Sequence, residues 1–437
     1  MLVFTFGPYK NLILQTLLSL TLTLILTFLN IPIRFLEGLH TYIHPENLSK
    51  DTTKSFRPAI RRPENNPESE QPQPKKKHRS KEKFEFDENN AQIFRLQLVD
   101  GHLRSRVYFS EYRDCFVYCF VAISSLVLHC FLPVTVSEEL GVWGNGVVIP
   151  VVLGIIVVLK LVFVIGKMSF ERSASKGSEK KLSVLMGFVG FIVAGFIVVV
   201  IAPLVLDFEF DSVDGFGKVL ICICAGCLTG FLFMPALHNA RSFWLGTDQL
   251  RWSLSIVSCG WFGRMILYVN YVVVVFTSLL WVNPVTKMFV NRSPDGDMGV
   301  SISDFKKFRV LCLLISGVLQ FVALRPNLQM YLNEAVLSWY QRLHASKVPD
   351  LDFSRAKIFL HNYYVCLVVL QFFAPPALIL IFLGLSRIEG NFLTTIPFLS
   401  SFLKEVALFM AWWVVFIWAM ISSSSLVLYR LSILYVS

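Results

Sequence analysis

A succession of long apolar segments constrains this chain of 437 residues more strongly than any other feature of its sequence. The segment 182–206, for example, is longer than the roughly 18–20 apolar residues that cross a hydrocarbon core about 30 Å thick. Only helices and closed barrels satisfy the backbone hydrogen bonds in lipid, and a barrel strand would alternate over about 10 residues. Because these runs are continuous, the sequence predicts an all-α, polytopic bundle of transmembrane helices. A hydrophobic fraction of 54% and a mean hydropathy of +0.60 exclude a soluble globular protein.

The pattern predicts about nine spans, and it allows a range of about eight to ten. Span 308–324 is the weakest because Arg325 cuts its apolar run short, and whether it crosses fully is left open. The first span is predicted to be retained, because its apolar run is too long for a secretory signal and no small-residue cleavage site follows. The predicted spans cover residues 11–30, 114–133, 146–166, 182–206, 218–237, 264–282, 308–324, 360–384 and 405–429.

Lysine and arginine in the short loops predict the orientation of the bundle, although they do not say which membrane, plasma membrane or endomembrane, holds it. The loops 134–145 and 207–217 lack both residues and carry carboxylates, so they are predicted to be non-cytosolic. The basic loop 167–181 is predicted to be cytosolic, and alternation then places the segment 31–113 and the C-terminus there. The loop 283–307 conflicts with this orientation, since it lies outside by alternation yet carries cations: Lys287, Arg292, Lys306 and Lys307.

The segment 31–113 is the one sizeable region predicted to lie outside the bilayer. Residues 50–92 are rich in Pro, Glu, Lys and Asn, which predicts disorder. Two interpretations stay open for the basic run Lys75–Lys81: a solvated linker, or a patch that binds anionic lipid headgroups. Cations on one side of a membrane protein explain the net charge of +10, so no nucleic-acid partner is expected.

Two small elements are predicted outside the spans. Residues 93–109 alternate around Asp100-Gly101 and predict a small β-hairpin at the cytosolic mouth of the bundle. Residues 327–345 predict a short amphipathic helix, either packed on the bundle or acting as a gate or partner surface. Its apolar stripe consists of Leu328, Leu332, Val336, Trp339 and Leu343.

Polar side chains inside the predicted spans are costly to bury without a partner or water, and four of them are candidates for a function: Lys160, Asn270, Gln320 and Gln371. Two interpretations stay open for the amides, namely hydrogen bonds that join helices or a polar pathway through the bundle. Lys160 either snorkels toward the cytosolic side or faces inward and marks an ion or proton path. Arg325 is expected to anchor at the interface or to pair with Glu334.

No segment carries a self-sufficient signature of catalysis, cofactor binding or metal binding. Cys224 and Cys227 lie three residues apart, but no His or carboxylate accompanies them in that span, so close helix packing is favoured over a metal site. The acidic loop 207–217 lacks the glycine and the bidentate glutamate of a calcium loop. We therefore expect no catalytic residues, no cofactor and no metal ion, and a protein that is not an enzyme.

Several motifs resemble those of the transmembrane protein 161 family, in the same order along the chain. They are Arg34-Phe35-Leu36 with Tyr42-Ile43-His44-Pro45-Glu46, Met234-Pro235-Ala236-Leu237, Leu280-Trp281-Val282-Asn283-Pro284-Val285-Thr286-Lys287, Leu328-Gln329-Met330-Tyr331-Leu332-Asn333-Glu334-Ala335, Tyr363-Tyr364 with Leu370-Gln371-Phe372-Phe373-Ala374-Pro375, and Trp412-Trp413. The chain is identified as a divergent member, because residues 50–92 match nothing and the loop 385–404 is shorter than the family's. The resemblance implies a multi-pass membrane protein that tunes cation currents and protects under oxidative or genotoxic stress.

Three functions compete at this point. The first is mediated or modulated ion transport along a polar seam of the four span residues, with ion channels or other membrane proteins as partners. The second is a membrane scaffold that presents the cytosolic arm to partners. The third is a lipid-modifying enzyme with His44 and Glu46 as acid and base, although their spacing does not place both on one helical face. The resemblance supplies no established site, and the candidates where motif and polarity coincide are His44, Trp281, Pro284, Gln329, Tyr331, Asn333 and Gln371.

Overall fold

The computed structural model describes most of the chain, and the account below concerns these residues alone. They are residues 9–43, 58–60, 93–132, 146–169, 177–201, 205–208, 210, 213–247, 259–290, 301–343, 351–388 and 397–434. The predicted disorder of 50–92 and the basic run Lys75–Lys81 lie outside them, except for the short strand β2 (Pro58–Ile60).

Within these ranges, nine helices are long and apolar enough to cross a membrane, which confirms the predicted all-α polytopic bundle. Their bounds agree with the predicted spans to within a few residues at most ends, although α9 runs ten residues past its predicted end at 237. The helices are α2 (Lys10–Phe28), α5 (Phe109–Phe131), α7 (Val148–Ser169), α8 (Gly177–Phe196) with a π-helical turn (Ile197–Ile201), α9 (Gly215–Thr247), α10 (Trp261–Leu279), α12 (Ile302–Leu343), α14 (Val365–Ser386) and α15 (Pro397–Arg430).

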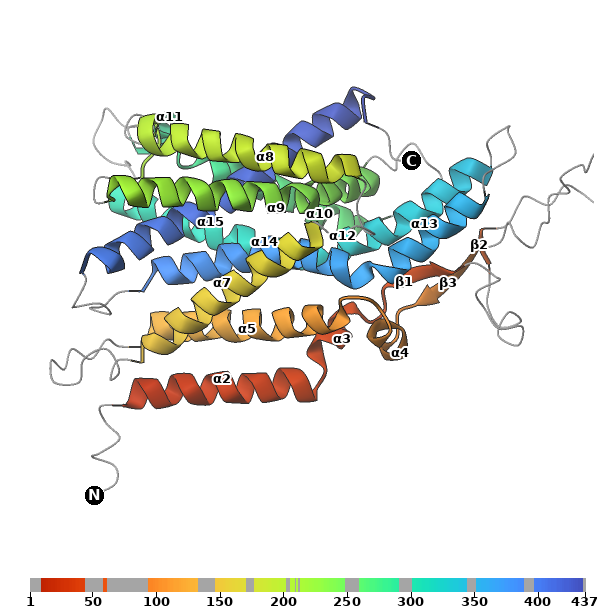
Figure 1. Ribbon diagram of the computed structural model, residues 1–437, viewed down its shortest axis with the longest axis horizontal. Coiled ribbons are helices and arrows are strands. Elements are labelled where there is room, and N and C mark those ends of the chain that lie inside the picture. Colours follow the sequence, from red (N-terminus) through yellow and green to blue (C-terminus); the bar gives the residue numbers. More distant parts are fainter. Residues whose placement is uncertain are drawn as a thin grey trace, which may run out of the picture.

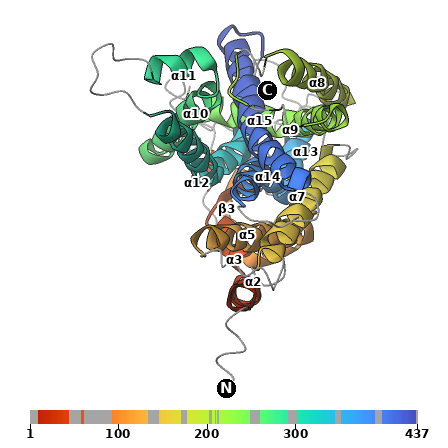
Figure 2. The same ribbon diagram turned by 90° about the vertical axis from the view of Figure 1, so that its left-hand side faces the viewer.

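Successive spans run in opposite directions, so the two termini lie at opposite ends of the bundle (Figure 1). This arrangement fits an odd number of crossings, while the side that faces the cytosol stays a prediction. Figure 2 shows α14 near the centre and α2 at the edge. The most apolar part of α14 is 89% buried, against 17% for α2, whose Leu17, Leu20 and Leu24 are exposed as lipid would require.

Two aromatic side chains of α15 bind to α9 and α10. Trp412 and Trp413 are almost fully buried, and each indole finds a backbone acceptor, as a buried tryptophan N–H requires. Trp412 Nε1 donates to the Ser278 carbonyl at 3.0 Å, and Trp413 Nε1 donates to the Ala225 carbonyl at 3.0 Å. The tryptophan pair therefore joins α15 to two neighbouring helices.

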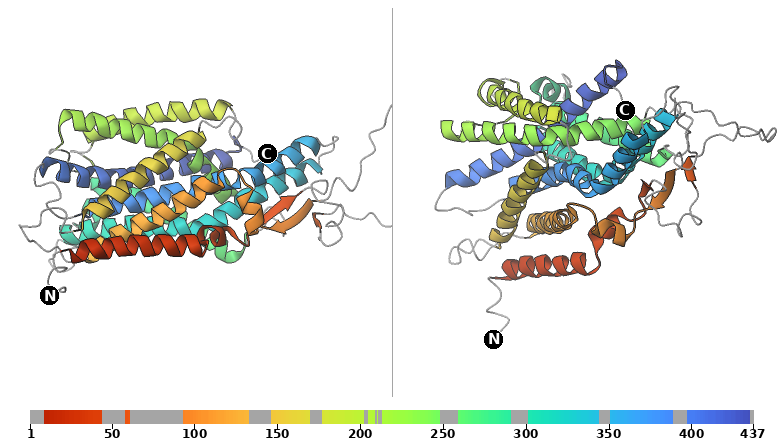
Figure 3. Two further views of the ribbon diagram at one scale, coloured as in Figure 1. Left: turned by 60° about the horizontal axis from the view of Figure 1, so that its bottom comes forward. Right: turned by 45° about the vertical axis from the view of Figure 1, so that its right-hand side comes forward.

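The predicted span 308–324 and the predicted amphipathic helix 327–345 are one continuous helix, α12, which corrects the separate short helix. Arg325 does not end it, because its guanidinium leaves the helix and donates to the Glu37 carbonyl at 2.9 Å. The predicted pairing of Arg325 with Glu334 is therefore wrong. The helix has 42 residues, a length of roughly 63 Å, which is about twice the thickness of a hydrocarbon core. Figure 3 shows two further views of how the helices and the small sheet are arranged.

The apolar stripe of the C-terminal part of α12 packs on the protein as expected. Leu328, Leu332, Val336 and Trp339 are all buried. Helix α13 (Leu351–Tyr363) packs beside this part of α12 and leads into α14, so the predicted span 360–384 begins only at Val365.

The predicted hairpin 93–109 is wrong in its second half. Strand β3 (Ile93–Gln97) forms, but the next residues fold into the short helix α4 (Asp100–Arg104) rather than a returning strand. Asp100 lies in the first turn of α4, where a carboxylate is favourable, and it pairs with Arg104 at 2.6 Å, four residues on. The strand instead pairs antiparallel with β1 (His40–Ile43) and β2, in a sheet of order β1-β3-β2.

Candidate functional site

A buried carboxylate forms the centre of a polar cluster between α9, α12 and α13. Glu334 on α12 is only 2% exposed. Its Oε1 lies 3.3 Å from Arg241 Nη1 on α9 and 3.4 Å from Lys357 Nζ on α13. A buried carboxylate without a partner is strongly unfavourable, so these two cations make its ionised form tolerable in the bundle.

Two histidines and a tyrosine extend this cluster. The ring of Tyr331 stacks on His361 with centroids 4.6 Å apart and lies 6.1 Å from His238 at a tilt. His238 Nδ1 lies 2.8 Å from Gln371 Oε1 on α14. Because an amide oxygen only accepts, His238 donates through Nδ1, which leaves its Nε2 as an acceptor when the ring is neutral. The cluster thus holds two imidazoles with a capacity for proton exchange beside a paired carboxylate.

Two further side chains interact with the charged residues around Glu334. Arg241 Nε donates to the Tyr429 hydroxyl at 3.3 Å, which connects the cluster to the end of α15. Glu179 near the start of α8 adds a second carboxylate whose charge acts on Arg241 and His238. The site therefore combines residues from α8, α9, α12, α13, α14 and α15.

His361 lies on α13, outside the candidate spans, and its surroundings favour the neutral imidazole. Burial lowers the pKa of His361 below its ordinary value, and the charge of Lys357 lowers it further. The carboxylate of Glu334 acts in the opposite direction but does not outweigh burial. At neutral pH, His361 is therefore uncharged, and acidification would bring an additional positive charge next to Lys357.

We call these residues the Glu334 cluster: Glu334, Arg241, Lys357, His238, His361, Tyr331 and Gln371. It lies at the end of the bundle that also carries the sheet and α13 (Figure 1). By the predicted orientation this is the cytosolic end.

The structure divides the four predicted seam residues among different places. Gln371 belongs to the Glu334 cluster. Gln320 Nε2 donates to the Ser316 hydroxyl at 3.2 Å within its own helix, while its Oε1 is buried without a partner among the described residues. The ammonium of Lys160 lies 3.9 Å from the centre of the Tyr118 ring on α5, a cation–π contact rather than a place in a central path.

Asn270 lies in a separate polar site between α9, α10, α12 and α15. It lines a cavity of about 10 Å³ together with Asn239, Asn327 and Ser422. Asn270 Oδ1, Asn327 Oδ1 and Ser422 Oγ are buried and have no partner within the described part of the chain. This volume is close to that of about one water molecule, which could bridge these three groups.

The remaining candidates lie at both ends of the bundle. Gln329 and Asn333 on α12 bind strand β1 next to the Glu334 cluster, and Tyr331 is part of that cluster. Trp281 is buried at the opposite end, and Pro284 is exposed near the start of α11 (Asn283–Val290). His44 lies outside the described residues.

Sequence reasoning missed the cations and histidines that surround Glu334. A weak signal exists, since His238 and Arg241 lie three residues apart, and Lys357 and His361 four apart, so that each pair shares a helical face. Glu334 is not a member of the predicted apolar stripe of its helix. It is nevertheless buried, because α9 and α13 cover that face of α12 as well.

The fold and this site define an integral, multi-pass membrane protein with ionisable side chains buried in the bundle. Residues 215–396 match the family described as predicted transmembrane protein 161AB. This matched part of the chain contains Glu334, Arg241, Lys357 and both histidines. No solved structure matches the chain.

Proposed function

We propose that this protein mediates or modulates ion transport. In this proposal, the charged side chains of the Glu334 cluster act on the transported ions. The observation that carries the proposal is a carboxylate, 2% exposed, held between two cations from different helices in a membrane protein. Ionisable groups inside membrane bundles are costly and typically belong to ion or proton pathways. Side-chain contacts that close an ion pathway at one end of the bundle, or that respond to charge at that end, would control an ionic current.

The first test is the protein-dependent cation flux of proteoliposomes, together with cation currents of cells that express the chain. Glu334→Gln is expected to abolish the protein-dependent component, because it removes the one negative charge between Arg241 and Lys357. Glu37→Gln is the matched control, since Glu37 is an exposed carboxylate at the same end of the bundle. It is expected to leave flux and currents unchanged.

A second variant separates a loss of function from a loss of folding. Glu334→Gln combined with Lys357→Met removes one charge of each sign, so the net charge of the cluster is preserved while the carboxylate is still lost. If this double variant elutes as a single species and has wild-type flux, the cluster is not the transport site. If the wild-type protein alters neither flux nor currents, the proposed function itself is wrong.

The other functions from the sequence analysis have no support in these contacts. An enzymatic role of His44 and Glu46, and lipid binding by Lys75–Lys81, stay predictions because these residues lie outside the described ranges. The scaffold function and the stress-protective role implied by the resemblance also stay predictions.

A further inference from the structure

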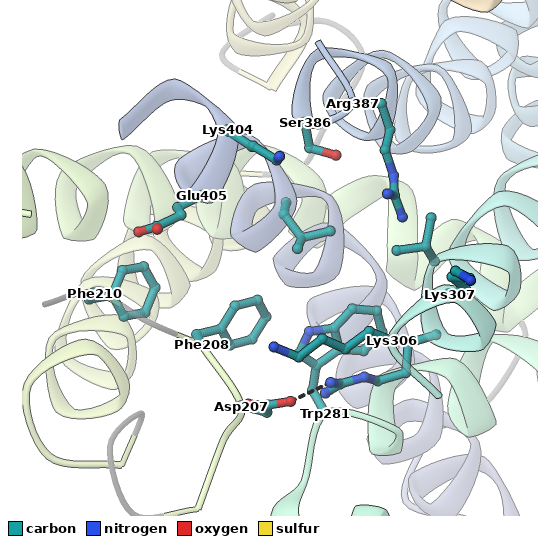
Figure 4. A pocket seen from close by; sticks show the side chains of 13 residues that line it. Asp207, Phe208, Phe210, Trp281, Lys306, Lys307, Ser386, Arg387, Lys404 and Glu405 are labelled. Atoms are coloured by element: carbon teal, nitrogen blue, oxygen red, sulfur yellow. Dashed lines mark hydrogen bonds and ion pairs between the residues drawn. The ribbon is translucent and has the colours of Figure 1, made fainter. Parts of the chain in front are cut away.

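A second site, unrelated to the Glu334 cluster, lies at the opposite end of the bundle. A cavity of about 480 Å³ opens between the start of α12, the end of α14, the start of α15 and the segment that follows α8. Figure 4 shows Lys404, Ser386 and Arg387 on one side of it and Asp207, Trp281 and Lys306 on the other. The cavity is more than large enough for a phosphate group with part of its substituent.

The charge of the lining is strongly positive. Five cationic side chains line the cavity, but only two carboxylates, those of Asp207 and Glu405, do so. Lys307 pairs with Asp304 at 3.3 Å, whereas Arg387 and Lys404 are exposed and have no ion pair with any residue that the structure describes. A concave surface with this excess attracts anions and concentrates them.

Arg309 supplies a buried donor in the same lining. It is 3% exposed and pairs with Asp207, and its guanidinium lies 5.3 Å from the centre of the Trp281 ring and 5.2 Å from that of Phe305. Its Nη1 is nevertheless buried with no hydrogen-bond partner among the described residues. A buried guanidinium nitrogen without an acceptor is unfavourable, and a small rotation of the Arg309 side chain would allow an anion in the cavity to become its acceptor.

The cations are also unexpected on this side of the bundle. Lys306 belongs to the loop that conflicts with the predicted orientation, because short non-cytosolic loops are usually poor in lysine and arginine. A ligand that requires positive charge would explain why these residues are present. The aromatic side chains of Phe208, Phe210 and Trp281 form the apolar part of the wall, so the ligand also has an apolar portion to bury.

We propose that this cavity binds a phosphate-bearing anion, with the phosphate held by Arg309, Arg387 and Lys404 and its apolar part against Trp281 and Phe208. Arginine binds phosphate through paired hydrogen bonds, and lysine adds a point charge. The phosphate is either the headgroup of an anionic phospholipid in the adjacent leaflet or that of a soluble compound. The proposal goes beyond ion transport, and its test needs no flux measurement.

The experiment measures binding to the purified full-length chain. One arm titrates inorganic phosphate and follows the thermal unfolding of the protein in uncharged detergent. The other arm counts bound lipid by native mass spectrometry after exchange from vesicles of phosphatidylcholine with and without phosphatidylglycerol. Binding in the first arm identifies a soluble phosphate compound as the source, and binding in the second arm alone identifies a lipid.

The decisive variant is Arg387→Gln with Lys404→Gln, since both side chains are exposed and their loss leaves no buried group unpaired. We expect it to weaken anion binding about tenfold or more, as the loss of two charged contacts requires. Lys287→Gln is the matched control, because Lys287 is an exposed cation at the same end that does not line the cavity. The proposal is overturned if neither anion binds saturably, or if the control weakens binding as much as the double variant does.

Discussion

The side-chain amide of Gln329 binds both backbone groups of His40. Its Oε1 accepts a hydrogen bond from the His40 N–H at 2.9 Å, and its Nε2 donates to the His40 carbonyl at 3.1 Å. In this way a helix side chain occupies the outer edge of β1, which would otherwise present unpaired backbone groups. The same helix accepts a hydrogen bond from the Tyr42 hydroxyl at Asn333 Oδ1, at 3.0 Å. Burial raises the pKa of Tyr42 to about 12, so this phenol remains a donor at physiological pH.

The first prediction concerns the attachment of β1. Gln329→Leu keeps the volume of the side chain but leaves two backbone groups of His40 without partners, each at a cost of about 1–3 kcal/mol. We expect faster hydrogen–deuterium exchange at the His40 amide and a lower free energy of unfolding. Gln97→Leu is the control, since Gln97 is exposed on β3, directly opposite His40. Equal exchange at His40 in both variants would show that Gln329 does not hold the strand.

The second prediction concerns the ion pairs of Glu334. Glu334→Met leaves two cations without their shared carboxylate, whereas Lys357→Met leaves Glu334 paired with Arg241. We expect the first substitution to lower the free energy of unfolding by about 3–5 kcal/mol and the second by clearly less. The measurement is denaturant unfolding in detergent, with a double-mutant cycle for the coupling. Additive effects of the two substitutions would mean that the side chains do not interact.

The third prediction is a dependence of stability on pH through His361. Its pKa is lowered in the folded protein, so below about pH 6.5 the unfolded chain binds a proton that the folded chain does not. The contribution of His361 to the free energy of unfolding is complete above about pH 6.5. It is lost as the pH falls toward the pKa of His361 in the folded protein, by at most about 1.4 kcal/mol per pH unit. We expect the thermal unfolding temperature to fall less on acidification in His361→Gln than in the wild type.

A control is needed because the chain has eight histidines. Burial also lowers the pKa of His40, and His238, Glu334 and Lys357 face His361 within the cluster. The exposed His102 is a suitable reference, since its side chain is not part of the Glu334 cluster. If His361→Gln and His102→Gln respond alike, His361 does not contribute.

The spans were predictable because the requirement for apolar length is local in sequence. Helix α14 shows this most clearly, since its continuous run is apolar on every face and the structure buries nearly all of it. The predicted hairpin 93–109 was wrong in its second half because the pairing of strands is not local in sequence. Strand β3 pairs with β1, more than fifty residues earlier, and nothing between residues 93 and 109 encodes that partner. Local alternation identified a strand but not its neighbour.

The Glu334 cluster could not be predicted from the sequence for a related reason. Its charged side chains come from separate helices, and a lone Arg241 or Lys357 just outside a predicted span resembles an ordinary interfacial cation. Only the packing of α9 and α13 against α12 shows that both reach one carboxylate. In contrast, the motif residues Gln329 and Asn333 were identified as candidates, although their contact with β1 depends on the fold.

The last prediction concerns the close contact between helices α8 and α9. A Cβ atom at Gly226 would lie 2.9 Å from Phe191 Cβ and 3.0 Å from the Gly187 carbonyl oxygen, so the helices would have to separate. Small residues permit such approaches between membrane helices, and overpacking typically costs about 1–3 kcal/mol. Gly226→Ala is therefore expected to lower the thermal unfolding temperature in detergent.

Gly215→Ala on the same helix is the comparison, because a Cβ there meets nothing within 4 Å. Alanine also favours the helix over glycine by about 0.5–1 kcal/mol, so this variant is expected to be neutral or slightly more stable. The neighbouring contacts make the difference informative: Trp413 of α15 donates to Thr229 at 3.2 Å, one turn from Gly226, so a displaced α9 would also strain α15. Equal unfolding temperatures for the two variants would mean that α8 and α9 do not pack this closely in the membrane protein.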